Sequence, residues 1–227
     1  MEELIMNKLN ILYEDNHLIV VEKEVNVLSQ EDNTHDIDML SLIKNYLKEK
    51  YQKPGNVYLG LVHRLDRVVG GVMVFAKTSK AAGRLSESIR KQEFHKSYLA
   101  VCHGKVKEHD TFIDYLKKED NFNTIISNQE EGKYSELSYD LIEYNAKEDL
   151  SLVNVSLKTG RHHQIRVQFS SRGHPLYGDN RYGKDGKKNI GLFAYQLSFI
   201  HPVKKEEMSF TVLPKHEPFN KFGLKIK

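Results

Sequence analysis

The fold of this chain is decided by one stretch, Leu61-Val62-His63-Arg64-Leu65-Asp66-Arg67-Val68-Val69-Gly70-Gly71-Val72-Met73-Val74-Phe75-Ala76-Lys77-Thr78. The stretch begins with charged residues, passes through two glycines and continues as five apolar residues, Val72 to Ala76. An apolar run of this kind predicts a strand that is buried on both faces. We therefore expect the charged residues to lie on a loop at the edge of a core strand.

The charged loop holds Asp66 between Arg64 and Arg67. Nearby positive charge favours the ionised form of a carboxyl group, so we expect Asp66 to be a carboxylate. A carboxylate flanked by guanidinium groups suits chemistry on a polyanion. The alternative is an exposed ion-pair cluster that contributes little to stability. These residues alone leave both interpretations open.

Length and composition restrict the classes of protein to which this chain can belong. The chain has 227 residues, 39% of them hydrophobic, which predicts one globular domain over 1–227 with a sizeable core. No apolar run approaches the ~20 residues of a membrane span, and the acidic N-terminus is unlike a signal peptide. The single cysteine, Cys102, excludes an internal disulfide framework and a multi-cysteine zinc site, so we expect a cytoplasmic protein. The formal net charge of +3 does not by itself demand a nucleic acid.

The N-terminal half alternates between strands and helices. Strands are expected over 9–13 and 18–22, around a turn at Glu14-Asp15-Asn16. Apolar residues from Met39 to Leu47 fall at helical spacing, and Asp36 or Asp38 is expected to cap that helix. A second helix follows the central strand, capped by Thr78 or Ser79.

The C-terminal half is richer in strands, which are expected over 94–103, 137–141, 153–157, 193–200 and 208–212. The segment 161–172 fits both a helix and a strand, and we favour a helix that ends before Gly173 and Pro175. Strands outnumber helices, and many resemble hairpins. The predicted class is therefore α+β, with a mixed, mostly antiparallel central sheet and flanking helices and loops.

Three other sequence patterns are weaker indications of a functional site. Gly178 to Asp185 nearly matches a phosphate-binding loop, but an aspartate replaces the required hydroxyl residue and no strand leads into it, so we favour a flexible basic loop. Neighbouring side chains are expected to point different ways, so His162 and His163 should not chelate one metal ion with His174, and contacts to phosphate or bases are favoured for them. Cys102 lies in an apolar strand and is interpreted as a core residue.

Four blocks in order resemble the RluA-type pseudouridine synthase family. The first is Leu12 to Lys23, and the second is His63-Arg64-Leu65-Asp66-Arg67 with the strand and Ala76-Lys77-Thr78 after it. The third is Lys96-Ser97-Tyr98-Leu99-Ala100. The fourth joins Gly160-Arg161-His162-His163-Gln164-Ile165-Arg166 to Gly173-His174-Pro175-Leu176-Tyr177-Gly178-Asp179 and Tyr182-Gly183. Together these blocks span about residues 9 to 200.

The chain departs from the family pattern at two places. Val69-Gly70-Gly71 stands where the family usually has Thr-Ser-Gly, next to the catalytic loop. Lys23-Glu24-Val25-Asn26 stands where it usually has Lys-Pro-x-Gly. No stretch resembling an S4-type RNA-binding extension precedes the first block, so we expect one of the short, single-domain members.

The resemblance implies an isomerase that converts uridine within structured RNA, ribosomal or transfer, to pseudouridine. Asp66 would be the essential carboxylate, acting by covalent attack or by proton abstraction. Arg166 would pair with Asp66, and Tyr98 would lie against the flipped uracil, where its hydroxyl serves as a base. The reaction oxidises nothing, so neither a cofactor nor a metal is implied.

RNA contacts are expected from Arg64, which would fill the gap left by the flipped base, and from a set of further side chains: Arg67, Arg161, His163 and Lys184. We expect a monomer. The alternative function is a catalytically inactive RNA-binding protein on the same fold, such as a ribosome-assembly factor, motivated by the changed Val69-Gly70. A hydrolase built on the histidines fails on their spacing. The sequence does not identify the RNA or the uridine that is modified.

Overall fold

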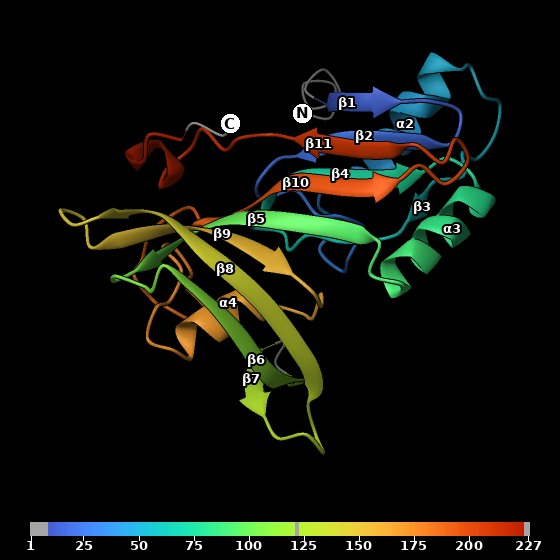
Figure 1. Ribbon diagram of the computed structural model, residues 1–227. Helices are drawn as coiled ribbons and strands as arrows, with labels where there is room; N and C mark the ends of the chain where they lie inside the picture. The colour runs from blue at the N-terminus through green and yellow to red at the C-terminus, as the bar shows by residue number, and fades with distance from the viewer. Residues whose placement is uncertain (1–8, 121–122, 225–227) are drawn as a thin grey trace. The chain divides into compact units, whose positions relative to one another are not determined.

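A computed structural model describes residues 9–120 and 123–224 (Figure 1). The chain divides into two compact units. Unit 1 combines the residues up to His95 with Gln196–Val212, and unit 2 combines Lys96–Tyr195 with the residues from Leu213 onward. Two strands, β5 (Phe94–His103) and β10 (Leu192–Ile200), contribute residues to both units. The expectation of a single domain stays a prediction.

Unit 1 is built on antiparallel strands. Its own strands are β1 (Asn10–Glu14), β2 (Leu18–Lys23), β3 (Gly60–Leu61), β4 (Gly70–Ala76) and β11 (Glu207–Thr211). Antiparallel ladders join β1 to β2, β2 to β4, β3 to β4 and β10 to β11. The strand expected over 72–76 is therefore present, and it begins two residues earlier, at Gly70.

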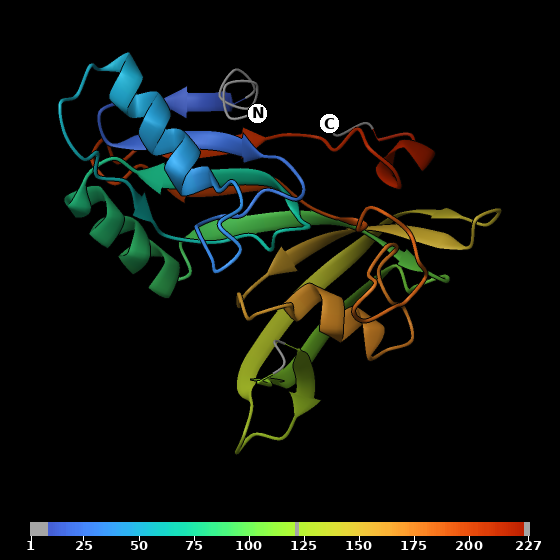
Figure 2. The same ribbon diagram turned by 180° about the vertical axis from the view of Figure 1, so that it is seen from behind.

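The central strand β4 is buried along its whole length, as the apolar run predicted. On one face Val72, Val74 and Ala76 pack with Leu85 of helix α3 (Ser79–Arg90). The other face, which carries Phe75, is equally buried, and α2 (Met39–Lys50) crosses β2 and β4 in Figure 2. A strand covered on both faces cannot shift without disrupting two layers of packing, so it gives the loop before it a fixed anchor.

The structure shows which of two candidate residues caps each of the helices α2 and α3. The Asp38 carboxylate accepts a hydrogen bond from the Ser41 N–H at 3.0 Å, and so caps α2. The Thr78 hydroxyl accepts from the Ala81 N–H at 3.2 Å, and so caps α3. Both caps satisfy N–H groups that the first helical turn leaves unpaired.

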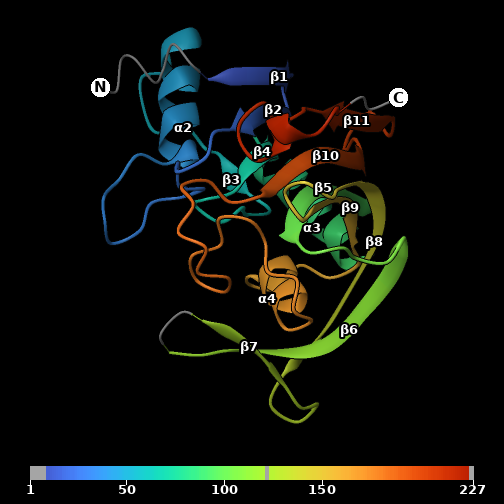
Figure 3. The same cartoon turned by 90° about the vertical axis from the view of Figure 1, so that its left-hand side faces the viewer.

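Unit 2 is an antiparallel ribbon that wraps around one short helix. The strand order is β10-β5-β9-β8-β6-β7, with β6 (His109–Lys118), β7 (Thr124–Ser127), β8 (Lys133–Asn145) and β9 (Leu150–Leu157). The helix α4 (Gln164–Ser170) packs against β6 and β7, and Figure 3 shows it beside that part of the ribbon. This helix confirms the choice of helix over strand within 161–172. A 3-10 turn, η1 (Phe219–Lys221), lies near the end of the described chain.

An aromatic cluster holds α4 to the ribbon. The rings of Phe112, Tyr139 and Phe169 lie 5.1–5.3 Å apart between centroids. All three side chains are buried. Because Phe169 belongs to α4, this cluster fixes the helix against β6 and β8.

The sequence did not predict β6 and β7, and the reason is visible in β6. Phe112 and Leu116 point inward, but the inward position between them is Asp114. That carboxylate accepts a hydrogen bond from Gln168 Nε2 at 2.6 Å and pairs with Arg172 Nη1 at 2.9 Å. A polar residue at an inward position breaks the alternation by which a strand is predicted.

The ladders whose registers are described within each unit are all antiparallel, which confirms the expected α+β class with a mostly antiparallel sheet. Among the described residues, no helix is both long enough and apolar enough to cross a bilayer.

Candidate active site

The loop that carries Asp66 is held on both sides of that residue within unit 1. Before it, the Ser29 hydroxyl donates to the Leu65 carbonyl at 2.8 Å and accepts from the Leu65 N–H at 3.1 Å. After it, the Arg67 carbonyl accepts from the Asn26 N–H at 2.8 Å. The Asp66 carbonyl itself accepts from the Val69 N–H at 3.0 Å, which closes a turn. The aspartate thus sits on a backbone that is fixed on each flank.

A buried lysine adds a further hold on this loop. Lys23, the last residue of β2, has no exposed surface. Its ammonium donates to the carbonyls of Val27 at 2.6 Å, Arg67 at 3.0 Å and Glu24 at 3.1 Å. Burial lowers the pKa of Lys23 to about 7; the charge of Arg67 acts in the same direction, whereas the negative charge of Asp66 opposes the shift. The Lys23 side chain is therefore part of the support of the Asp66 loop.

The side chain of His63 also anchors the loop. Its Nε2 accepts from the Val74 N–H at 3.1 Å, and its ring meets Phe94 edge-on at 5.4 Å. His63 therefore joins the beginning of the loop to the middle of β4. Sequence reasoning gave a role neither to His63 nor to Lys23. Lys23 follows Glu22 at the end of β2, and no local pattern distinguishes this buried lysine from an exposed one.

The two arginines of the loop face solvent. Arg64 is exposed, and Arg67 forms an exposed ion pair with Asp36 at 2.7 Å. An exposed pair of this kind is weak, so the Arg67 side chain stays available to a stronger anion. The departure from the family pattern is buried nearby: the Val69 side chain packs in the core, and only its N–H takes part in the loop turn.

In unit 2, α4 places Arg166 in a buried position. Arg166 Nε donates to Asp179 Oδ2 and Arg166 Nη2 donates to Asp179 Oδ1, each at 2.8 Å. The arginine side chain is 7% exposed and the aspartate side chain 0%. The ring of Tyr182 lies over the guanidinium, 5.3 Å from centroid to Cζ. Bidentate pairing fixes the plane of an arginine more firmly than a single hydrogen bond does.

The two adjacent histidines lie at the start of α4, and one expectation about them is wrong. Their rings stack at 3.7 Å instead of pointing different ways. The cause is the left-handed backbone of His163, with φ 52°, which turns its side chain back onto His162. His162 Nδ1 hydrogen-bonds the Thr124 hydroxyl at 2.9 Å, and His163 Nδ1 hydrogen-bonds the Tyr182 hydroxyl at 2.8 Å.

The other expected contact residues of unit 2 lie near this start of α4 and on the loop after it. Arg161 is exposed, and its Nε donates to the Tyr134 carbonyl at 3.0 Å. Lys184 is exposed on the loop 178–189. Asp185, in the position of a phosphate loop's hydroxyl, instead accepts from the Gly178 N–H at 2.7 Å and pairs with His103 at 2.9 Å. These bonds tie the loop to itself and to β5.

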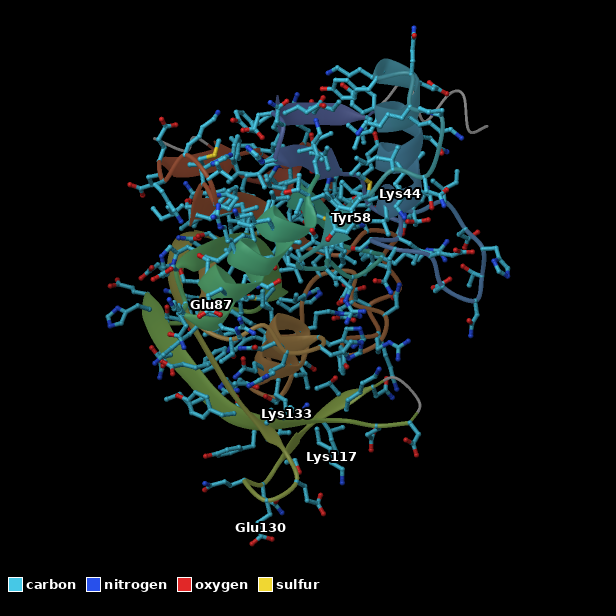
Figure 4. All side chains as sticks on the ribbon, turned by 90° about the vertical axis from the view of Figure 1, so that its right-hand side faces the viewer. Lys44, Tyr58, Glu87, Lys117, Glu130 and Lys133 are labelled. Atoms are coloured by element: carbon cyan, nitrogen blue, oxygen red, sulfur yellow. The ribbon has the colours of Figure 1, made fainter. Side chains whose placement is uncertain are left out.

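Charge at the far end of the β6–β8 ribbon is mixed. Figure 4 shows Lys117, Lys133 and Glu130 there, and Lys117 pairs with Glu131 at 2.8 Å. The ribbon end is therefore not a continuous basic patch.

Tyr98 lies on β5, opposite Val155 of β9, and is buried. Asp66 belongs to unit 1, whereas Tyr98 and Arg166 belong to unit 2. The grouping of these three residues in one site comes from the family resemblance and stays a prediction.

Two observations concern the Cys102 thiol and metal binding. Burial raises the pKa of the Cys102 thiol to about 12, so this cysteine is a core residue and not a nucleophile. Within residues 9–120 and 123–224, no group of three or more His, Cys, Asp or Glu side chains is placed to hold a metal ion.

A family model described as RNA pseudouridylate synthase matches residues 17–171, a segment that includes Asp66, Tyr98 and Arg166. The chain belongs to this family. Similarity to relatives extends beyond that segment. An uncharacterized RNA pseudouridine synthase of Aquifex aeolicus is 33% identical over 218 residues, which cover 90% of this chain and 69% of the relative. YjbO of Bacillus subtilis, also named an uncharacterized RNA pseudouridine synthase, is 34% identical over 89% of this chain and 71% of its own length.

A third relative carries a more specific name. Ribosomal large subunit pseudouridine synthase C of Haemophilus influenzae is 31% identical over 91% of this chain and 66% of its own length. The chain thus spans about two thirds of the length of these relatives. Together the relatives confirm the expected RluA-type membership and the expected enzyme class, an isomerase that acts on RNA.

A solved structure supports the fold. Human RNA Pseudouridylate Synthase Domain Containing 1 has a TM-score of 0.75 with 24% identity, covering 94% of this chain and 86% of that protein. At this identity the likeness concerns the fold alone, and it agrees with the α+β class expected from the sequence.

Proposed function

We propose that the chain isomerises specific uridines of structured RNA to pseudouridine, with Asp66 as the essential carboxylate. One observation carries the proposal: the backbone on both flanks of Asp66 is fixed, by Ser29 at Leu65 and by Lys23 and Asn26 at Arg67. A reacting group held in advance reduces the entropy that must be lost on reaching the transition state. A protein that only binds RNA has no need for such a carboxylate, so the binding-only alternative is not favoured.

The chemistry balances without an oxidant. The bond between ribose C1′ and uracil N1 breaks, the uracil turns, and a bond forms between C1′ and C5. The hydrogen on C5 leaves as a proton, and N1 gains one. Asp66 either attacks the nucleotide covalently or removes a proton from the ribose, and in both cases it must be ionised.

The other residues would support that carboxylate and the base. Arg166 would orient Asp66 through its guanidinium, and Tyr98 would lie against the flipped uracil and take the C5 proton. Extrusion of the base costs a few kcal/mol, and the exposed Arg64 would fill the space that it leaves. The phosphate backbone would meet a set of exposed or partly exposed side chains: Arg67, Arg161, His163 and Lys184.

We further propose ribosomal RNA as the substrate, in preference to transfer RNA, because similar proteins carry the name ribosomal large subunit pseudouridine synthase. The expectations of a cytoplasmic monomer that needs neither metal nor cofactor stay predictions.

The substrate is tested by mapping pseudouridines in total RNA from the source organism before and after deletion of this gene. We expect one or a few sites in large-subunit ribosomal RNA to disappear, and to return when the wild-type gene is restored but not with Asp66→Asn. Loss of sites in transfer RNA alone would overturn the substrate assignment while leaving the reaction intact. An unchanged map would count against the proposed function as a whole.

A further inference from the structure

The proposed reaction uses Arg166 but assigns no part to Asp179, its partner in a buried ion pair. The Asp179 side chain is completely buried and takes two of the arginine's N–H groups, each at 2.8 Å. Burying two charges costs free energy that the attraction between them does not always recover. A pair in this position therefore calls for an explanation other than stability.

The carboxylate of Asp179 is fixed by its own loop. Its Oδ1 accepts from the N–H groups of Arg181 at 3.1 Å and Tyr182 at 3.2 Å. Its backbone carbonyl accepts from the N–H groups of Gly183 at 2.7 Å and Lys184 at 3.0 Å. The acceptor is thus placed by the turn that surrounds it, independently of the arginine.

The turn also has a glycine that its geometry requires. Gly178 has φ 68°, and a Cβ there would lie 1.9 Å from the Asn189 carbonyl oxygen. Only glycine fits this backbone and this approach, so the position of the next residue, Asp179, is set by the chain itself.

A second contact holds the guanidinium from its face. The Tyr182 ring lies over Arg166, and its hydroxyl accepts from the Thr124 N–H at 2.9 Å and bonds His163 Nδ1 at 2.8 Å. Burial raises the pKa of Tyr182, which keeps that hydroxyl protonated. The ring is therefore tied to β7 and to the start of α4, and it cannot turn freely.

We propose that Asp179 is a positioning residue for Arg166: it fixes the edge of the guanidinium, while Tyr182 fixes its plane, so that the remaining N–H groups are presented in one direction. The inference rests on the proposed function, in which Arg166 orients Asp66. An arginine has five N–H donors in a rigid fork, and a pair that uses Nε and Nη2 at one edge sets the direction of the rest. Asp179 also neutralises the buried cation.

The test compares Asp179→Asn with a matched control, Asp114→Asn. The control removes the charge from another aspartate–arginine pair of unit 2, that of Asp114 with Arg172. The substrate is total RNA labelled with tritium at uracil C5, isolated from a strain that lacks the gene. Tritium release is followed at several enzyme concentrations, all in excess over the RNA. The series gives two quantities: the maximal single-turnover rate and the enzyme concentration at which half of that rate is reached. Each variant is assayed well below its own unfolding temperature.

We expect Asp179→Asn to lower the maximal single-turnover rate by roughly 100-fold, because a small misplacement of a reacting or orienting group has an effect of that size. The half-saturating concentration should change by less than about threefold, since RNA binding is not affected. Asp114→Asn should lower the unfolding temperature and leave the rate unchanged. Equal rates for Asp179→Asn and the wild type would overturn the inference, as would an equal loss of rate in both variants.

A second arm asks whether Asp179 acts through Arg166. In an Arg166→Lys background, which keeps a cation but loses the fork, adding Asp179→Asn should lower the rate much less than it does in the wild type. A full loss in both backgrounds would show that Asp179 acts independently and would overturn the proposal. If turnover by Arg166→Lys is below detection, the proposal is tested only by the comparison of Asp179→Asn with Asp114→Asn and the wild type. If Asp179→Asn does not fold, Tyr182→Leu replaces it in both arms, with roughly tenfold expected from the loss of one supporting contact.

The experiment distinguishes failure of the proposed function from failure of the positioning role of Asp179. No tritium release by the wild-type enzyme would contradict the proposed function. Release by the wild type with no effect at Asp179 would contradict only the positioning role.

Discussion

Lys23 fixes the Asp66 loop to the end of β2. It is a fully buried lysine whose amine lies within hydrogen-bond distance of three carbonyl groups, one of them 44 positions away on the loop of Asp66. The family resemblance included Lys23 but gave it no role. Its burial depends on where Arg67 lies in the fold, and no local pattern in the sequence contains that information.

The titration of Lys23 gives a prediction for stability. Burial lowers its pKa from the ordinary value of 10.5 to about 7. Between these values the folded chain binds fewer protons than the unfolded chain, so the free energy of unfolding rises with pH across this window. The contribution is fully present above 10.5 and is lost as pH falls towards 7.

Urea unfolding of the wild type and Lys23→Met across this window measures the effect. The difference in free energy of unfolding, wild type minus variant, should increase as pH rises from about 7 to about 10.5. Subtraction of the variant removes the contribution of groups that titrate in both proteins. A difference that stays constant with pH would mean that Lys23 is not the titrating group.

Among single residues, the sequence was most informative where chemistry is local. Asp66 was singled out by its flanking charges. The pairing of Arg166 with Asp179 was not foreseen, although Asp179 stood in the fourth block, because a motif shows which residues occur and not which bonds they make.

The helix caps show what local pattern can and cannot decide. Aspartate before a helical apolar pattern correctly predicted a capped α2, but Asp36 and Asp38 were equal candidates from sequence. The structure selects Asp38, which is buried and bonds the Ser41 N–H, whereas Asp36 makes an exposed pair with Arg67.

This difference provides a matched pair of variants. Asp38→Ala should lower the free energy of unfolding by about 1 kcal/mol, the usual cost of a lost cap. Asp36→Ala should lower it by about 0.5 kcal/mol or less, because exposed ion pairs contribute little. Chemical denaturation of both variants measures this. A larger loss at Asp36 than at Asp38 would reverse the assignment of the cap.

Strands were predicted well where burial is simple and poorly where it is not. The two-sided burial of β4 follows from a continuous apolar run, and β5 was predicted with its observed bounds, Phe94–His103. In β6 the inward Asp114 concealed the alternation. Its partners, Gln168 and Arg172, lie on and just after α4, more than 50 residues further along the chain. Likewise, the stacking of His162 on His163 depends on one left-handed residue that no apolar pattern reveals.

For the molecule as a whole, net charge says little about its partner. The formal value is only +3, yet three arginines and one lysine that we assign to RNA contact are exposed. Such contacts release counterions from the RNA, so the binding constant falls as salt rises, with a slope set by the number of contacts.

We therefore expect Arg67→Ala and Arg161→Ala each to reduce that slope by about 1 on a log–log plot. Lys107→Ala is the control, because Lys107 is exposed and pairs with Asp110. Binding of large-subunit ribosomal RNA is measured by filter retention at a series of salt concentrations. Slopes that are unchanged in the arginine variants, or reduced as much by the control, would contradict the assigned contacts.

The fold class and the family could be predicted because four blocks occur in order along most of the chain. What the sequence could not provide is the set of long-range bonds that fix those blocks, such as the contact of Lys23 with the Arg67 carbonyl. These bonds turn a motif into a site with a fixed geometry.

The most direct measurement is tritium release from ribosomal RNA labelled at uracil C5, with purified wild-type protein and Asp66→Asn. The RNA comes from a strain that lacks the gene, so the target uridine is unmodified. We expect the wild type to release tritium and Asp66→Asn to release none above background, while it unfolds at the same temperature and binds the RNA within about threefold of the wild type. Comparable release by Asp66→Asn, or none by the wild type, would contradict the role of Asp66 as the essential carboxylate of an RNA pseudouridine synthase.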